Sequence, residues 1–265
     1  MFEIMDLDNT TNMNDDPSSD QCEPIDIILV ETSHPGNIGA TARAMKNMGL
    51  SNLVLVNPKD YPNVEATQRA SGADDVLQRA IVKDTLREAV SNATLVVGAS
   101  ARFRRLAWPQ WDAREAGINV IKHCRQQQGR VALVFGRENN GLSNEEMELC
   151  HYLVQIPTHV KYSSLNLSQA VQVVCYELRM ACITSTETDS QTLDSPLAEH
   201  EVVEQMFDHI HEVLTDIDFI NKDHPVKLLR RIRRMFHKAE LEEKEVQIVR
   251  GIFAAVENKI RKNGQ

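Results

Sequence analysis

The chain has 265 residues, of which 42% are apolar, so it can bury a core for one large domain or for a medium and a small one. No apolar run approaches the roughly 20 residues that span a bilayer, and the N-terminus lacks the basic and apolar segments of a signal peptide, so we expect a cytoplasmic protein without a membrane segment. The five cysteines include no CxxC pair and the histidines are scattered, which argues against a disulfide framework and against a metal site.

The net charge of −9 is concentrated at the N-terminus. Residues 1–23 hold seven acidic side chains and no lysine or arginine, so −7 of the −9 lies there and −2 remains for the rest of the chain. This acidic segment is polar with little periodicity, which is typical of a disordered tail. Its charge therefore says nothing about what the folded part binds.

Between residues 24 and 183, short β-branched runs alternate with helix-periodic segments. This pattern predicts one α/β domain with a mostly parallel sheet covered by helices. The expected strands are 25–31, 52–57, 94–100, 131–136 and 152–156. The expected helices are 38–48, 64–71, 85–91, 112–127, 144–148 and 165–183.

The chain changes character after this domain. Residues 184–196 are rich in threonine, serine and aspartate without a hydrophobic period, which predicts a linker. Residues 197–214, 225–239 and 241–262 are all helix-periodic, so we expect a small all-α domain over residues 197–265. Its middle helix, KLLRRIRRMFHKA, is basic without one acid; a solvated face is possible, but so one-signed a run favours nucleic acid. The candidate RNA-binding residues there are Arg230, Arg231, Arg233 and Arg234.

Turns that follow the strands are candidate ligand sites, because ligands of open α/β sheets bind at the carboxyl ends of strands. The first turn, HPGNIGATARAM, places Asn37 at a helix start and Arg43 about two turns later. The guanidinium of Arg43 offers a rigid fork that suits phosphate. The glycine spacing matches neither the dinucleotide fingerprint nor a P-loop, so nucleoside triphosphate chemistry has no support.

Two further turns follow the third and fourth expected strands. In GASARFRRLAWP, small residues permit close backbone approach, and Arg102 and Arg104 supply positive charge for a polyanion. In FGRENNGLSNEE, Gly136 ends the strand, and Ser143 with Glu146 resembles a capping box. Glu138 is either the partner of an arginine, the simpler interpretation, or a catalytic carboxylate.

A last turn, IPTHVKYSSLNLSQ, leads from a short strand into a long helix. Pro157 cannot extend a central ladder, so the chain must leave the sheet there. Ser163 and Ser164 then stand near the helix start, where they form either an ordinary N-cap or part of a ligand pocket. The sequence has no nucleophile elbow, metal cluster or acid pair, so this site of glycines, serines and arginines suits group transfer from a cofactor.

Taken in order, NIGATARAM, LVFGRENNGLS and IPTHVKYSSLNLSQAVQ resemble the three signature motifs of the SPOUT superfamily of knotted RNA methyltransferases. Within that superfamily the chain is similar to tRNA 2′-O-methyltransferases over residues 25–262. The resemblance implies a trefoil knot at the end of the α/β domain, S-adenosylmethionine as methyl donor and a homodimer. It also implies, as acceptor, the ribose of tRNA anticodon-loop nucleotide 32, a cytidine or uridine.

The resemblance also implies residue roles. The implied cofactor contacts are Ala99, Ser100, Ala101, Gly136, Ile156, Ser163, Ser164 and Leu165. The implied catalytic group is Arg43, Asn37, Ser164 and Glu138, with Arg43 binding the phosphate beside the target ribose. Arg102 and Arg104 would hold RNA near the catalytic centre, while the basic helix would grip the tRNA body. Two alternatives remain open at this point: a knotted RNA-binding protein without catalysis, and a methyltransferase acting on ribosomal RNA.

Overall fold

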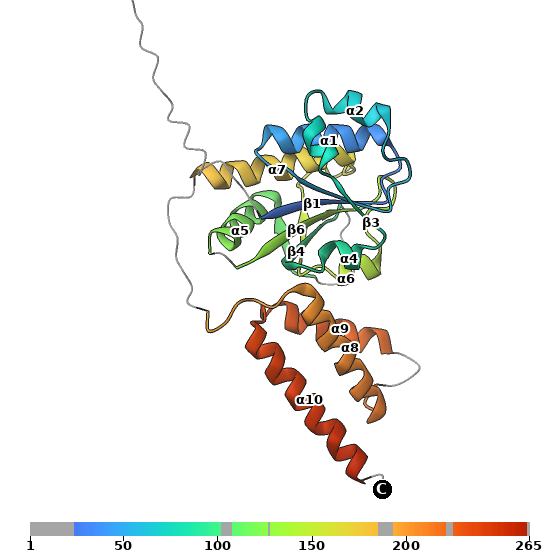
Figure 1. Ribbon diagram of the computed structural model, residues 1–265, viewed down its shortest axis with the longest axis vertical. Coiled ribbons are helices and arrows are strands. Elements are labelled where there is room, and N and C mark those ends of the chain that lie inside the picture. Colours follow the sequence, from blue (N-terminus) through green and yellow to red (C-terminus); the bar gives the residue numbers. More distant parts are fainter. Residues whose placement is uncertain (1–23, 102–107, 127, 185–192, 221–224, 264–265) are drawn as a thin grey trace, which may run out of the picture.

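The computed structural model describes residues 24–101, 108–126, 128–184, 193–220 and 225–263 (Figure 1). The expected acidic tail and most of the expected linker lie outside these residues. No helix among the described residues is long and apolar enough to cross a membrane.

A seven-stranded sheet forms the centre of the α/β part, in the order β3-β2-β1-β6-β4-β7-β5, and every pair of neighbours is parallel. The strands are β1 (Ile25–Val30), β2 (Asn52–Val56), β3 (Ile81–Lys83), β4 (Ala93–Ala99), β5 (Gln110–Asp112), β6 (Arg130–Phe135) and β7 (Tyr152–Gln155). The five central strands are those that the sequence predicts, whereas the three-residue edge strands β3 and β5 are not. Because all strands are parallel, their carboxyl ends share one edge of the sheet.

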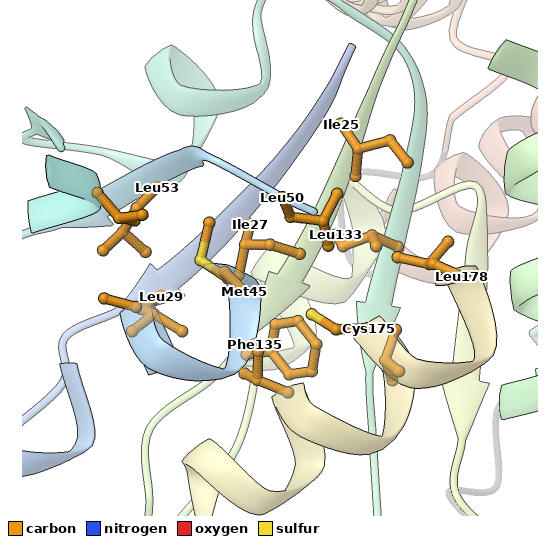
Figure 2. Close-up of a cluster of buried hydrophobic side chains, with 14 of the residues drawn as sticks. Ile25, Ile27, Leu29, Met45, Leu50, Leu53, Leu133, Phe135, Cys175 and Leu178 are labelled. Carbon is orange, nitrogen blue, oxygen red and sulfur yellow. The ribbon is translucent and has the colours of Figure 1, made fainter. Parts of the chain in front are cut away.

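Helices cover both faces of this sheet (Figure 1). They are α1 (Pro35–Asn47), α2 (Val64–Ala70), α3 (Asp74–Gln78), α4 (Leu86–Val90), α5 (Ala113–Arg125), α6 (Asn144–Glu148) and α7 (Leu167–Thr184). The two faces have separate cores because side chains alternate along a strand: Ile27 and Leu29 face α1 and α7, whereas Ile28 and Val30 face α4. Figure 2 shows part of the first core, where Met45 of α1 lies close to Ile27.

Three helices follow as the expected all-α region: α8 (His200–Asp216), α9 (Pro225–His237) and α10 (Glu243–Asn263). We call residues 193–263 the helical extension. Its buried core is built around Met206, Phe207 and Ile210 of α8 with Val246 of α10, and this cluster contains no residue of the α/β part. The extension therefore has a hydrophobic core of its own.

Three histidines are buried where the extension meets the α/β part. His151 precedes β7, His200 begins α8 and His237 ends α9. The ring centroid of His151 lies 4.6 Å from that of His237 and 6.0 Å from that of His200. Burial lowers the pKa of all three imidazoles, that of His151 to about 4, and the positive charge of Arg233 adds to this effect at His200 and His237. The three rings are therefore neutral at neutral pH.

These histidines predict that the protein loses stability in mild acid. Each imidazole has a pKa near 6.5 when unfolded and a lower pKa when folded, so the unfolded chain binds more protons as the pH falls. The free energy of unfolding should keep its full value above about pH 6.5 and should decrease as the pH falls toward about 4. Protonation of His151 alone should account for a loss of about 3 kcal/mol. Urea unfolding across this range measures the slope.

A matched control is available on α8, where His211 is exposed. His151→Gln should flatten the dependence of the free energy of unfolding on pH, whereas His211→Gln should leave it unchanged. A folded state equally stable at about pH 7 and at about pH 5 would show that the buried rings do not titrate as their burial requires.

Candidate active site

The carboxyl ends of β4, β6 and β7 enclose a cavity of about 210 Å³. This volume is several times the ~30 Å³ share of one water molecule, so the cavity has room for part of a small organic molecule. Because β6, β4 and β7 are neighbours in the sheet, their loops meet although they are far apart in sequence. All eight expected cofactor contacts line this cavity: Ala99, Ser100, Ala101, Gly136, Ile156, Ser163, Ser164 and Leu165.

The cavity lining combines apolar walls with hydroxyl groups at its mouth. Phe135, Val154 and Leu167 contribute apolar surface, and Thr158 adds a hydroxyl to those of the serines. Such a lining suits a ligand with a flat apolar part and several polar groups. Ser163 and Ser164, for which an N-cap was one alternative, line the cavity and do not cap the helix.

The cap of α7 is Asn166 instead. Its side-chain Oδ1 accepts hydrogen bonds from the backbone N–H of Ser168 at 2.9 Å and from the Ser168 hydroxyl at 2.7 Å. The helix consequently begins at Leu167, two residues later than expected. This shift leaves Ser163 and Ser164 in the turn before the helix. The capping box expected of Ser143 and Glu146 is present at the start of α6.

The turn after β6 closes directly on Gly136. A Cβ atom at Gly136 would lie 2.2 Å from the carbonyl carbon of Gly141 and 2.3 Å from the backbone nitrogen of Leu142. Arg137 and Gly141 pair across this turn through two backbone hydrogen bonds of 3.2 and 2.9 Å. Gly141 has a φ of 66°, in the left-handed region that glycine tolerates. Only glycine therefore fits at position 136 in this arrangement.

Glu138 fastens the same turn to the start of α1. Its carboxylate accepts hydrogen bonds from the backbone N–H and hydroxyl of Ser33, from the backbone N–H of His34 and from the side-chain amide of Asn37 at 3.0 Å. Burial raises the pKa of this carboxyl, but the hydrogen bonds from Asn37 and the backbone outweigh burial and hold the pKa below its ordinary value. Glu138 is thus an ionised anchor.

Asn37 extends this network to the last motif. Its side-chain oxygen accepts a hydrogen bond of 3.1 Å from the side-chain amide of Asn166. Glu138, Asn37 and Asn166 therefore link three turns in series: the β6 turn, the start of α1 and the start of α7. These polar contacts hold the three turns in a fixed arrangement around the cavity.

Arg137 is the site residue that the sequence analysis missed. Its guanidinium makes hydrogen-bonded ion pairs with Glu31 at the end of β1, at 2.6 and 3.0 Å, and with Glu146 of α6, at 2.9 Å. From the sequence, Glu138 is considered as the partner of an arginine. The structure instead shows Arg137, its neighbour in the chain, in ion pairs with Glu31 and Glu146. The capping box was a signal for Glu146, but no local pattern indicated Glu31, which is 106 residues from Arg137.

The expected RNA-contacting arginines have different surroundings. Arg43 is exposed on α1, about 9 Å along the helix axis from Asn37, and has no hydrogen-bond or ion-pair partner among the described residues. It does not line the cavity. Arg102 and Arg104 lie outside the described residues.

Within α9 the four arginines differ as well. Arg231 is exposed and Arg234 is half-buried. Arg230 forms an ion pair with Glu148 of α6, and Arg233 forms one with the buried Glu204 of α8. The one-signed helix that the sequence presents is therefore partly neutralised by carboxylates from other elements.

Comparison with known proteins agrees with this fold. Residues 24–176 match the SpoU rRNA Methylase family, and residues 201–265 match the C-terminal domain of the tRNA methyltransferase TrmJ. The chain therefore belongs to the SpoU rRNA methylase family and, within it, to the TrmJ group. The predicted membership of a family of RNA methyltransferases is confirmed.

Individual relatives support this assignment over nearly the whole chain. The tRNA (cytidine/uridine-2′-O-)-methyltransferase TrmJ of Sodalis glossinidius is 45% identical over 237 residues, which cover 88% of this chain and 91% of that protein. The TrmJ of Escherichia coli K12 is 45% identical over 241 residues, which cover 90% and 97%. The crystal structure of TrmJ from Z. mobilis ZM4 is 33% identical with a TM-score of 0.76 and covers 87% of this chain and 98% of that one.

Gly136→Ala should change the shape of the cavity without removing any of its polar groups. The added Cβ meets backbone atoms of the turn, which cannot rotate away as a side chain would, so the turn must move. We expect binding of S-adenosylmethionine, measured by calorimetry, to weaken at least tenfold. Gly251→Ala is the control, because a Cβ there meets nothing within 4 Å. Equal affinity in both variants would refute the tight closure of the turn on Gly136.

Proposed function

We propose that this protein transfers a methyl group from S-adenosylmethionine to the ribose 2′-hydroxyl of nucleotide 32, a cytidine or uridine, in the anticodon loop of tRNA. The observation that carries the proposal is one cavity lined by the turns that follow β4, β6 and β7, in a chain of the SpoU methylase family. The tRNA substrate is supported by the relatives named TrmJ and by the matching C-terminal domain. Nucleotide 32 rests on the resemblance alone.

The residues around the cavity fit this cofactor. Bound S-adenosylmethionine supplies a methyl group on a positively charged sulfur. Arg137 lines the cavity, but its positive charge is balanced by Glu31 and Glu146, and the ionised Glu138 leaves the surroundings net negative. A cation is therefore favoured over an anion here. The bare backbone at Gly136 and the hydroxyls of the last motif would hold the polar parts of the cofactor.

Arg43 has the properties that a phosphate-binding residue needs. It is exposed and no described carboxylate pairs with it, so its guanidinium is available to a polyanion. It would hold the phosphate beside the target ribose and so align the 2′-hydroxyl, with Ser164 contributing at the cavity. Orientation of this kind supplies much of the rate in an in-line transfer. A guanidinium group does not act as a base in proteins, so a phosphate oxygen or water takes the proton.

Asn37 and Glu138 act differently from Arg43 in this proposal. The carboxylate of Glu138 is fully engaged by donors at the start of α1, and Asn37 uses both ends of its amide in the network. Both residues would keep the cavity walls and the Arg43 helix in a fixed relation. They position the site and take no proton.

The remaining parts of the proposal concern RNA and assembly. Arg102 and Arg104 would hold RNA near the cavity, and Arg231 of α9 is the exposed candidate on the extension. Arg230, Arg233 and Arg234 would contribute less directly, because the first two have carboxylate partners within the chain and the third is half-buried. On the family resemblance we further propose a cytoplasmic homodimer with a trefoil knot. Among the described residues, no group of three or more metal-ligating side chains is placed to hold a metal.

Methyl-labelled S-adenosylmethionine, incubated with the protein and either tRNA or ribosomal RNA, tests the proposal. Mass spectrometry of the digested RNA should find 2′-O-methylated cytidine or uridine at nucleotide 32 of tRNA only. Label in ribosomal RNA would favour the alternative substrate. Cofactor binding without label in either RNA would favour the RNA-binding protein without catalysis.

Arg43→Ala should lower the methylation rate at least a hundredfold, because the phosphate beside the ribose loses its partner. Binding of S-adenosylmethionine should persist, since Arg43 lies outside the cavity lining. Arg79→Ala is the control: Arg79 is an exposed arginine of the α/β part, and it pairs with Asp75 of α3. Full methylation by the Arg43 variant would remove this residue from the mechanism.

A further inference from the structure

The helical extension is joined to the α/β part mainly through polar contacts. Its apolar core contains only its own residues, and the two cores of the sheet contain none of the extension. Units that do not share a hydrophobic core are expected to move relative to one another. The orientation of the extension must therefore be set by specific hydrogen bonds and ion pairs at the junction.

Glu204 lies at the centre of this junction. It belongs to α8, its side chain is 1% exposed, and it is bound by two arginines from different parts of the chain. Arg87 of α4 approaches from the α/β part, with its Nη2 at 3.1 Å from Glu204 Oε2. Arg233 of α9 binds Glu204 Oε1 from within the extension. One buried carboxylate thus bridges the two parts of the molecule.

The surroundings of this bridge restrict its geometry. The guanidinium of Arg233 lies over the ring of Phe207, 4.6 Å from its centroid, which limits the rotamers that it can adopt. Arg87 also binds Asp208 of α8 at 3.1 Å, so α4 holds two successive turns of α8. The backbone N–H of Glu201 donates to the carbonyl of Ser91 at 3.1 Å, next to the same end of α8. A buried charge has few arrangements in which it is fully paired, so this junction favours one orientation.

Two other contacts of α9 lie on the same side of the sheet. Arg230 pairs with Glu148 of α6, and the Nδ1 of His237 lies 3.2 Å from the carbonyl oxygen of Cys150, to which it donates. Figure 1 shows α4 and α6 on the side of the sheet that faces the extension. The basic helix α9 is thereby fixed relative to the α/β part, and Arg231 remains exposed on it.

We propose that Glu204 is a positioning residue that, through Arg87 and Arg233, fixes the helical extension at the angle that brings the target nucleotide of a bound tRNA to the cavity. This inference rests on the proposed function. α10 has 21 residues and is about 30 Å long, so a rotation of ~10° at the junction displaces its far end by about 5 Å. That displacement exceeds the roughly 3.4 Å spacing of nucleotides along a stacked strand. A loosened junction would therefore misplace the substrate by about one nucleotide.

Arg87→Gln is the first test, because Arg87 is 44% exposed and its loss leaves the Glu204–Arg233 pair inside the extension intact. We expect kcat/KM for tRNA to fall about tenfold while KM for S-adenosylmethionine stays unchanged. Part of the methyl label should move to a neighbouring nucleotide. Arg79→Gln, which removes an equal charge from an exposed ion pair within the α/β part, should behave as the natural protein does.

A double-mutant cycle separates orientation from a direct contact of Arg87 with RNA. If Arg87 acts through Glu204, Arg87→Gln combined with Glu204→Gln should lower kcat/KM for tRNA no further than Glu204→Gln alone. Additive losses would overturn the proposal, and so would an Arg87 variant with kcat/KM for tRNA within twofold of the natural value. Thermal unfolding checks that each variant is folded.

Small-angle X-ray scattering gives a readout that does not depend on methylation. The Arg87→Gln protein should have a larger maximum dimension than the natural protein and the Arg79 control, and an unchanged scattering curve would contradict the fixed junction. If the natural protein fails to methylate tRNA, the proposed function fails, while scattering still decides whether Glu204 holds the extension. If the natural protein is active and the Arg87 variant is equally active, only the positioning role fails.

Discussion

The cavity depends on the absence of a side chain at Gly136. Since no Cβ stands there, the turn after β6 can fold back until the carbonyl of Gly141 touches the strand end. This close approach sends the next two side chains in different directions. Arg137 reaches Glu31 and Glu146, and Glu138 reaches the start of α1. One glycine directly after the central strand β6 thereby places both an ion-pair cluster and a carboxylate anchor beside the cavity.

Charge around the cavity follows from this arrangement. Arg137 is surrounded by two carboxylates, so it contributes little net positive charge, and Glu138 is kept ionised by backbone and amide donors at the N-terminus of α1. In the proposed function, the positive charge for RNA lies outside the cavity, on Arg43 and on the exposed Arg231 of α9. The net negative surroundings of the cavity would then keep the phosphates of the RNA out of the cofactor pocket.

The sequence predicts the central strands and the cavity because both depend on local patterns: continuous apolar runs for β1 and β6, and small polar turns at strand ends. It does not predict β3 or β5, because three residues carry too little pattern, and Ile81 and Val82 of β3 are half-exposed. The sequence also does not predict ion pairs between residues that are far apart in the chain. The helix that contains Arg230 and Arg233 has no acidic residue, so its sequence indicates no ion-pair partner for either. In the structure Arg230 pairs with a carboxylate of α6 and Arg233 with a carboxylate of α8.

The extension and the cavity meet opposite ends of one strand. His151 and Tyr152 at the start of β7 contact the extension, through the ring of His237 and through a 3.0 Å hydrogen bond from the Tyr152 hydroxyl to Glu240. Val154, near its other end, lines the cavity. β7 has four residues and spans about 13 Å, is hydrogen-bonded on both sides, and Trp111 of β5 stacks on Tyr152 at 3.8 Å. A strand so short and so fully paired cannot bend appreciably, so the distance from the junction to the cavity is set by the sheet. The position of the extension relative to the cavity then depends on the angle between the extension and the α/β part. In our proposal this angle is set by the ion pairs around Glu204.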